Sequence, residues 1–290
     1  MDVSLAGSRQ IFGLRYLEPA IDLRAMVSSY YIFWASLPSV ADLMRADMPQ
    51  LRFMLKGAGS YSFANGHTTT APEIALIGPT MGASHVNVVG PVLVFGVALL
   101  PAGWAALVRE DASGHADVLV DGTAIFGPLL RDTIEAMRNA PTVDVMVSIA
   151  DAVMRVLVAQ RGDAPFWFTQ MTDHWLVGAA SPEVDTLVAS AGMSARQVER
   201  LARRIYGAAP KQLARKYRAL RAASLLASGC TSWQDVAGDA FYDQSHFIRE
   251  VKHFTGLTPR QLMRDPPPVT KLMSQRREMT GHLSELALLS

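Results

Sequence analysis

The sequence predicts an α+β fold in which a β-rich N-terminal domain is followed by an all-α domain. Three observations lead to this prediction. Short segments rich in aromatic and β-branched residues, separated by turn residues, continue to about residue 125. From about Gly127 the apolar residues recur with the period of an α-helix. Residues 193–213 and 242–262 then repeat each other without a gap at a constant offset of 49 residues.

The β-rich part contains several short runs that are typical of strands. Asn65-Gly66 lies between two of them, and this pair is the strongest short hairpin signal because both turn residues must accept positive φ. Such a series predicts a sandwich or a small barrel. A parallel βαβ arrangement is disfavoured, since no helical pattern separates the runs. The expected strands are residues 30–34, 51–55, 60–64, 67–70, 73–77 and 92–100.

Two helices are expected after the strands. Residues 129–137 place their apolar side chains on one helical face, whereas residues 143–159 are apolar nearly all round. A helix of the second kind must be buried, either within its own domain or against a second subunit. Both alternatives stay open, and the second leads us to expect a homodimer. Residues 161–165 break the helical pattern, so we expect a first domain at 1–165.

Composition favours a soluble protein whose C-terminal part meets a polyanion. Residues 1–165 carry 11 Lys/Arg against 15 Asp/Glu, whereas residues 166–265 carry 13 against 9. No apolar stretch reaches the roughly 18 residues of a membrane span. The N-terminus does not resemble a secretory signal. The single Cys230 cannot form an internal disulfide. A cytoplasmic setting and no membrane partner are therefore expected.

Each copy of the repeat has helix-capping and helix-terminating residues at the positions that a helix-turn-helix requires. In the first copy, Ser181 is expected to cap a short helix that starts at Pro182, and Ser194 to cap a second helix. Gly207 is expected to end that helix. Pro210 then starts a long basic helix that joins the two copies. In the second copy, Asp243 is expected to cap the corresponding second helix. The matched pairs are Arg200 with Arg249, Gly207 with Gly256, Pro210 with Pro259, Gln212 with Gln261, and Leu213 with Leu262.

Two copies that each expose arginine and glutamine predict contact with double-stranded DNA. Arginine forms paired hydrogen bonds with guanine and glutamine with adenine in the major groove. Surrounding cations neutralise phosphates. The sequence therefore predicts a DNA-binding domain at 166–265 with two contact surfaces. The expected DNA-binding residues are Ser194, Arg196, Gln197, Glu199, Arg200 and Arg203 in the first copy, and Gln244, Ser245, His246 and Arg249 in the second.

Residues 170–265 resemble the AraC/XylS family of transcription regulators. The resemblance rests on the sequences G-M-S at 192–194, G-x-x-P at 207–210, F-Y-D-Q-S-H-F at 241–247 and G-L-T-P at 256–259. It implies two helix-turn-helix modules on one long helix, contacting major-groove segments about 34 Å apart. The base-contacting positions of the family fall on Arg196, Glu199, Arg200, Gln244, Ser245 and Arg249.

The sequence also departs from the family pattern. Ala240 replaces a usual glycine, and the segment from Val236 to Phe241 is one residue short, so the second turn is expected to be distorted. Val251 replaces a usual aromatic residue. The N-terminal region resembles the cupin-like sensor domains of such regulators, which implies an effector-sensing and dimerisation domain. RNA polymerase would be a further partner of an activator.

Candidate effector-binding residues were sought among large and charged side chains of the N-terminal domain. They are Trp34, Arg52, Tyr61, Phe95 and Trp104; the competing interpretation is ordinary core for the aromatic residues and a surface salt bridge for Arg52. No metal site is expected, because His67, His85 and His115 have no ligand spacing. No cofactor motif and no catalytic motif is present, so we expect no enzyme.

Two alternatives remain open at this stage. The chain could be an enzyme or ligand-binding protein of cupin-like fold whose helical C-terminal part does not contact DNA. The tail at 266–290, which begins with three prolines, could be disordered or could form a short helix from about Lys271.

Overall fold

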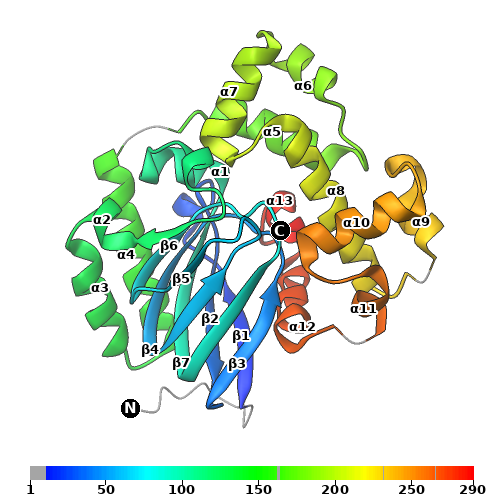
Figure 1. Ribbon diagram of the computed structural model, residues 1–290. Coiled ribbons are helices and arrows are strands. Elements are labelled where there is room, and N and C mark those ends of the chain that lie inside the picture. The colour runs from blue at the N-terminus through cyan, green and yellow to red at the C-terminus, as the bar shows by residue number, and fades with distance from the viewer. Residues whose placement is uncertain (1–10, 162–163, 231, 265) are drawn as a thin grey trace.

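The computed structural model describes residues 11–161, 164–230, 232–264 and 266–290 of the chain. A sheet fills the lower centre of the molecule, with α3 and α4 on one side and the helical C-terminal part above it and on the other side (Figure 1). The predicted α+β order, an antiparallel sheet followed by a helical region, is confirmed. No helix in these ranges is long and apolar enough to cross a membrane.

The described ranges contain one antiparallel sheet of eight strands, in place of the two stacked sheets of a sandwich. Its main order is β1-β2-β7-β4-β6-β8, while β3 pairs with β7 and β5 with β4. The Asn65-Gly66 hairpin is confirmed, since Ser62 pairs with Thr68 and Gly66 has a φ of 85°. The strands are β1 Phe12–Leu17, β2 Val27–Ala35, β3 Ser39–Met44, β4 Gln50–Ser62, β5 Thr68–Thr70, β6 Ile74–Ile77, β7 Ser84–Leu99 and β8 Leu119–Asp121.

Two long strands account for the main differences from the predicted strand pattern. The expected strands at 51–55 and 60–64 belong to one strand, β4, whose pairing with β7 shifts between Met54 and Ala58. Such irregularities bend a strand without ending it. β7 starts at Ser84, eight residues before the expected start, because its first half pairs with β3.

Side chains of the sheet alternate between two separate cores. Tyr30, Ile32, Leu51 and Phe53 pack under α3 (Leu129–Arg138) and α4 (Val143–Arg161). Their neighbours along β2 and β4 point to the opposite face, because successive side chains of a strand alternate. That face is lined by a second apolar cluster, which includes Met54, Tyr61, Val86, Val88 and Val94.

The helix α4 buries its inner face against the sheet and exposes Val145 and Val156 on the other side. Within the N-terminal domain, α4 is therefore buried along one face only, and its other face stays exposed. Short segments complete the N-terminal part: α1 Pro101–Gly103, a π-helical turn at Trp104–Val108, and α2 Gly122–Phe126.

The repeat forms two helix-turn-helix modules, which are joined by α8. The second helices, α7 and α10, begin and end at the same offset of 49 residues that the sequences share. Gly207 and Gly256 end them in the left-handed conformation, with φ of 84° and 77°. The helices are α5 Phe166–Gly178, α6 Val184–Ala191, α7 Ala195–Tyr206, α8 Pro210–Ala227, α9 Trp233–Ala237, α10 Gln244–Thr255 and α11 Pro259–Arg264.

The first helix of the first module differs from expectation in its N-cap, whereas the turn of the second module follows the prediction. Helix α6 starts at Val184 with Glu183 as its N-cap, so the predicted cap at Ser181 was wrong. The Ser181 hydroxyl instead accepts a hydrogen bond from Arg218 at 3.3 Å. In the second module, α9 ends at Ala237 and a 3₁₀ turn at Gly238–Ala240 leads to Phe241, so the turn is distorted as the short segment predicted.

The two predicted domains share packing across the boundary expected at residue 165. Met48, Met81 and Leu100 of the N-terminal part join a core with Phe168, Ile205 and Tyr217. Gly207 lies where an added Cβ would come within 2.5 Å of Pro79. The boundary itself stays a prediction, but the helix-turn-helix modules rest directly on the sheet domain.

The tail forms helices that return to the sheet. α12 covers Pro268–Ser274, a 3₁₀ helix covers Gln275–Met279, and α13 covers Glu285–Leu289. Of the two alternatives for the tail, the helical one is therefore correct, with a start at Pro268, before the expected Lys271. α12 lies beside the sheet and the C-terminus reaches the centre of the molecule (Figure 1).

Candidate DNA-binding surface and effector cavity

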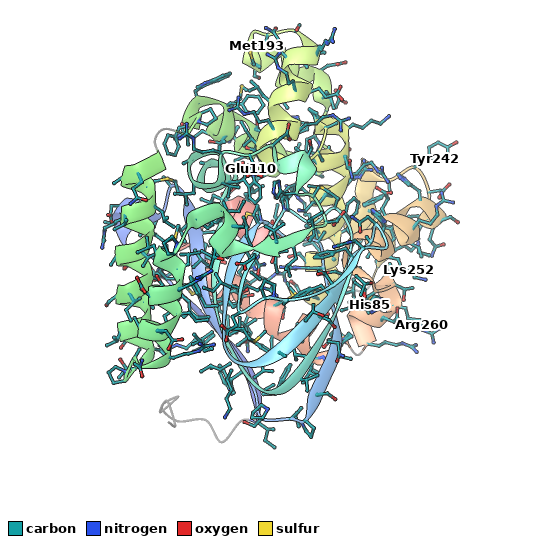
Figure 2. All side chains as sticks on the ribbon, turned by 60° about the vertical axis from the view of Figure 1, so that its left-hand side comes forward. His85, Glu110, Met193, Tyr242, Lys252 and Arg260 are labelled. Carbon is teal, nitrogen blue, oxygen red and sulfur yellow. The ribbon has the colours of Figure 1, made fainter. Side chains whose placement is uncertain are left out.

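The N-terminal ends of α7 and α10 are the exposed ends of the two modules. Met193 and Tyr242, which come just before these helices, both lie at the outer edge of the molecule (Figure 2). The opposite ends are packed: Tyr206 and Phe254 are buried, and Phe254 contacts Ala46 of the sheet domain. Each helix is therefore held at its C-terminal end and free at the end where a recognition helix contacts bases.

On α7, the side chains of Arg196 and Arg200 are free, whereas that of Gln197 is not. Arg196 and Arg200 are exposed and form no hydrogen bond or ion pair with any other described residue. Gln197 forms a capping box with Ser194: its Oε1 accepts from the Ser194 backbone N at 3.0 Å and from the Ser194 hydroxyl at 2.8 Å. A paired bond from Gln197 to adenine would therefore require this box to open.

Two other predicted residues of α7 are paired with each other. Glu199 accepts a hydrogen bond from Arg203 at 2.9 Å, one helical turn away, and both side chains are about half exposed. The pair offsets the charge of Glu199 without burying it. Arg203 is thus partly neutralised, and the net positive charge of this surface comes from Arg196, Arg200 and the exposed Arg204.

On α10, Gln244, Ser245 and Arg249 are exposed, and their side chains contact no described polar partner. His246 is half-buried: its Nδ1 accepts from the Tyr242 backbone N at 3.4 Å, and its ring lies 5.8 Å from that of Phe241. Asp243 caps the helix as predicted. His246 therefore fixes the start of α10, while the other three side chains face solvent.

The basic joining helix α8 uses most of its charge inside the protein. Arg215 forms two hydrogen bonds with Glu250 of α10, at 2.9 and 2.7 Å. Arg221 donates to the carbonyls of Leu176 and Val177 at the end of α5. Lys216 is buried and donates to the Asp47 carbonyl at 2.8 Å. The excess positive charge of the C-terminal part is thus only partly available to a polyanion.

A cavity lies on the sheet face opposite α3 and α4, between β1, β2, β3, β4, β7 and the tail. The space between its walls, counting the part that is open to solvent, is about 820 Å³. The walls are mostly apolar, and the polar lining groups contact one another in one network, the polar end of the cavity. The polar lining residues are Tyr16, Tyr31, Asp47, Gln50, Arg52, Tyr61 and Arg276.

Arg52 is the central polar group of this cavity. Its guanidinium donates to Gln50 Oε1 at 2.9 and 2.6 Å and to the Tyr61 hydroxyl, and it lies 5.8 Å from the centre of the Tyr31 ring. No carboxylate of the described residues is within salt-bridge distance of it. Burial opposes the charge of Arg52, but the neighbouring Tyr31 and Tyr61 keep its pKa above the ordinary value.

Gly96 makes room for the polar end of the cavity. It pairs with both Tyr31 and Arg52, on the two neighbouring strands. A Cβ at this position would come within 2.0 Å of the Tyr31 ring. The missing side chain therefore allows Tyr31 to lie across β7 with its hydroxyl 2.6 Å from Gln50 Oε1.

Of the five predicted effector-binding residues, the structure brings two to the cavity. Arg52 and Tyr61 line it. Trp34, Phe95 and Trp104 lie instead in or against the core beneath α3 and α4. Trp34 and Phe95 fall there because they alternate with Phe33 and Val94, which do line the cavity.

Several lining residues escaped the sequence analysis. Tyr31, Gln50 and Met54 share the alternation of Phe33 or Arg52, so strand parity could have identified them. Val269, Met273 and Arg276 come from the tail, and no local signal places the tail on the sheet. No group of three potential ligands that could hold a metal ion occurs among the residues that the structure describes.

Comparison with known proteins supports the assignment of the modules. A family model described as a helix-turn-helix domain matches residues 187–265. No curated protein is similar enough in sequence to match the chain. The structure of ToxT from Vibrio cholerae is 9% identical, with 78% of this chain and 97% of that chain covered and a TM-score of 0.47.

Two further solved structures are similar to the chain, also at low sequence identity. ToxT bound to an unsaturated fatty acid is 10% identical, covers 89% of this chain and 97% of that chain, and has a TM-score of 0.44. The AraC-like transcriptional activator CuxR is 12% identical, with 66% and 80% covered and a TM-score of 0.32. The predicted resemblance is confirmed by the family match: residues 187–265 form a helix-turn-helix domain of the AraC type.

Proposed function

We propose that the protein is a sequence-specific DNA-binding transcription regulator that responds to a small-molecule effector held in the sheet cavity. The observation that carries the proposal is the pair of equivalent helices, α7 and α10, each with an exposed arginine at the same position, Arg200 and Arg249. Free arginine on a helix held at its far end is well suited to bidentate contact with guanine.

The cavity supports an effector with an apolar body and one acidic group. Arg52 remains charged, lines a mostly apolar space, and has no carboxylate partner among the described residues. A carboxylate or sulfonate at this position would gain charge-assisted hydrogen bonds in a site of low polarity. The apolar walls would bury the rest of the ligand.

Genomic selection followed by a mobility-shift assay tests the DNA-binding part of the proposal. The full chain should enrich a defined motif at physiological salt and bind it more tightly than unrelated DNA. If no motif is enriched with or without candidate acids, the proposal that the chain is a DNA-binding regulator fails. The alternative, an enzyme or ligand-binding protein whose helical C-terminal part does not contact DNA, is then favoured.

A pair of variants on one strand tests the effector part. Arg52→Met removes the buried cation, whereas Lys56→Met removes an exposed cation from the same strand, β4. A medium-length alkyl carboxylate should bind the Lys56→Met variant and the wild type equally, and should bind Arg52→Met weakly. Equal binding by all three proteins would show that Arg52 is not the anchor.

Two partners remain part of this proposal. A homodimer would use a surface outside the two recognition helices, and the exposed Val145 and Val156 of α4 make its outer face a candidate. Light scattering of the full chain at micromolar concentration measures the dimer directly. RNA polymerase is a partner only if the protein activates transcription, which a reporter with the selected motif would decide.

A further inference from the structure

The helix α12 forms one wall of the effector cavity. Val269 and Met273 are buried and line the apolar part of the cavity, as do Val40 and Met44 of the strand β3. α12 packs against β1 and β3, the strands at the open side of the sheet. A ligand that fills the cavity must therefore contact the C-terminal tail.

The start of α12 is held by an aspartate of the sheet. Its N-cap residue, Pro267, provides no side-chain cap. The Asp42 Oδ2 of β3 accepts a hydrogen bond from the Val269 backbone N at 2.8 Å and so takes the place of the cap. One partly exposed carboxylate thus holds the start of α12 over the cavity, in addition to the packing of Val269 and Met273.

The other end of the tail is fixed at the polar end of the cavity and inside the first module. Arg276 is 2% exposed and forms two hydrogen bonds with Asp47, at 3.0 and 2.9 Å. It also donates to the Ser290 carbonyl at 2.6 Å. Leu286 and Ala287 of α13 join the core that contains Phe168 and Tyr217.

Asp47 connects the cavity, the tail and the DNA-binding modules. Its Oδ2 accepts from Gln50 Nε2 at 2.8 Å, and Gln50 is the partner of Arg52. Its carbonyl accepts from Lys216 of α8 at 2.8 Å. Burial would raise the pKa of Asp47, but the charge and hydrogen bonds of Arg276 outweigh this effect and hold the pKa below its ordinary value. A change at Arg52 can therefore reach Arg276 through three successive hydrogen bonds, by way of Gln50 and Asp47.

We propose that residues 268–290 act as a latch: α12 opens to admit the effector, and the closed latch transmits occupancy of the cavity to the first helix-turn-helix module. This inference rests on the proposed effector cavity. A bound ligand packs against Val269 and Met273, stabilises the closed position of α12, and thereby tightens the contacts of Arg276 and α13. The latch is part of the ligand site as well as its cover.

Association kinetics of the fluorescent anion 1-anilinonaphthalene-8-sulfonate test the opening of the latch. This probe has an aromatic body and a sulfonate that suits Arg52. Asp42→Ala removes the cap of α12 and should increase the association rate constant about fivefold, the factor that corresponds to the ~1 kcal/mol of a lost helix cap. The matched control is Asp121→Ala, which removes an aspartate cap from α2, away from the tail. It should leave the rate constant unchanged.

Hydrogen exchange of the wild-type chain tests the transmission step without any variant in the latch. Saturation with the same probe should slow amide exchange in residues 268–274 and 285–289, and Arg52→Met should abolish this effect. Equal association rates for Asp42→Ala and Asp121→Ala, or unchanged exchange in the tail with probe bound, would overturn the latch and leave the cavity standing. If the probe binds Arg52→Met as well as wild type, or fails to bind wild type, the cavity assignment fails and the latch with it. The proposal that the chain binds DNA has its own test, the mobility-shift assay, and it stands or falls independently of these results.

Discussion

Replacing the buried lysine of the joining helix should stabilise the protein at neutral pH. Lys216 lies 2% exposed between α8 and the sheet domain, and burial lowers its pKa from 10.5 to about 8. Each pKa unit is worth ~1.4 kcal/mol, so keeping this ammonium charged at pH 7 costs about 3 kcal/mol. Lys216→Met removes that cost. It also removes a hydrogen bond worth about 1 kcal/mol. The free energy of unfolding should therefore rise by about 2 kcal/mol.

The pH dependence of the same variant provides the sharper test. Between pH 8 and 10.5 the unfolded chain still binds the proton that the folded chain has released, so the stability of the wild type rises with pH in this window. The Lys216→Met variant lacks this rise, and its advantage should vanish near pH 10. The Asp47 carbonyl keeps the Thr80 backbone N as a donor at 3.1 Å, so it is not left unpaired.

Urea unfolding of wild type, Lys216→Met and the exposed control Lys211→Met at pH 7 and pH 10 measures both effects. The control should match the wild type at both values. A Lys216→Met protein that is less stable than wild type at pH 7, or that differs from it equally at pH 7 and pH 10, would refute the reasoning. In that case the ammonium would be stabilised by its surroundings more than burial penalises it.

Three further substitutions give expected outcomes of different kinds. Glu250→Gln breaks the ion pairs of α10 with Arg215 and, at 3.7 Å, with Arg218, and should lower the free energy of unfolding by about 2 kcal/mol in urea titrations. Burial raises the pKa of Asp173 to about 7, so the free energy of unfolding of the wild type should fall as pH rises from 4 to 7. The Asp173→Asn variant should lack this fall, and a variant that shows it unchanged would exclude the carboxyl of Asp173 as its source. Gly96→Ala places a Cβ against the Tyr31 ring and should lower the free energy of unfolding by about 1–3 kcal/mol. It should also weaken the binding of a carboxylic acid, as measured by calorimetry; an unchanged affinity would mean that Tyr31 does not shape the polar end of the cavity.

The helical modules could be predicted closely because their signals are local. A cap, a periodic apolar stripe and a terminal glycine each lie within one turn of the structure that they determine. The repeat added the register, and α7 and α10 begin and end at the predicted offset. The misplaced start of α6 had a tertiary cause: the hydroxyl of Ser181 is engaged by Arg218, which is 37 residues away in the chain.

The cavity could be predicted only in part because its shape depends on distant segments. The sequence indicated Arg52 and Tyr61 by residue type, but Trp34 and Phe95 were assigned without regard to strand parity. Sheet alternation separates these two pairs once the register is known. The contribution of Arg276 could not be foreseen, since its partner Asp47 is 229 residues away.

The basic character of α8 was the least informative signal. Its cations contribute to the positive charge from which a polyanion partner was predicted, whereas Lys216 contacts the sheet domain and Arg215 contacts α10. Charge alone does not distinguish a surface that binds DNA from one that joins helices, because both need cations near acceptors. Only exposure without a partner, as at Arg200 and Arg249, separates the two uses.

The most direct test compares the DNA motifs selected from a random pool by wild type, Arg200→Ala and Arg249→Ala. The two helices should specify two groups of base pairs about one helical turn apart. Arg200→Ala should relax one group and Arg249→Ala the other, each with a loss of about 1–3 kcal/mol on the wild-type site. A single block of specified bases, or uniform weakening on all sequences by both variants, would contradict the claim that α7 and α10 are two independent recognition helices.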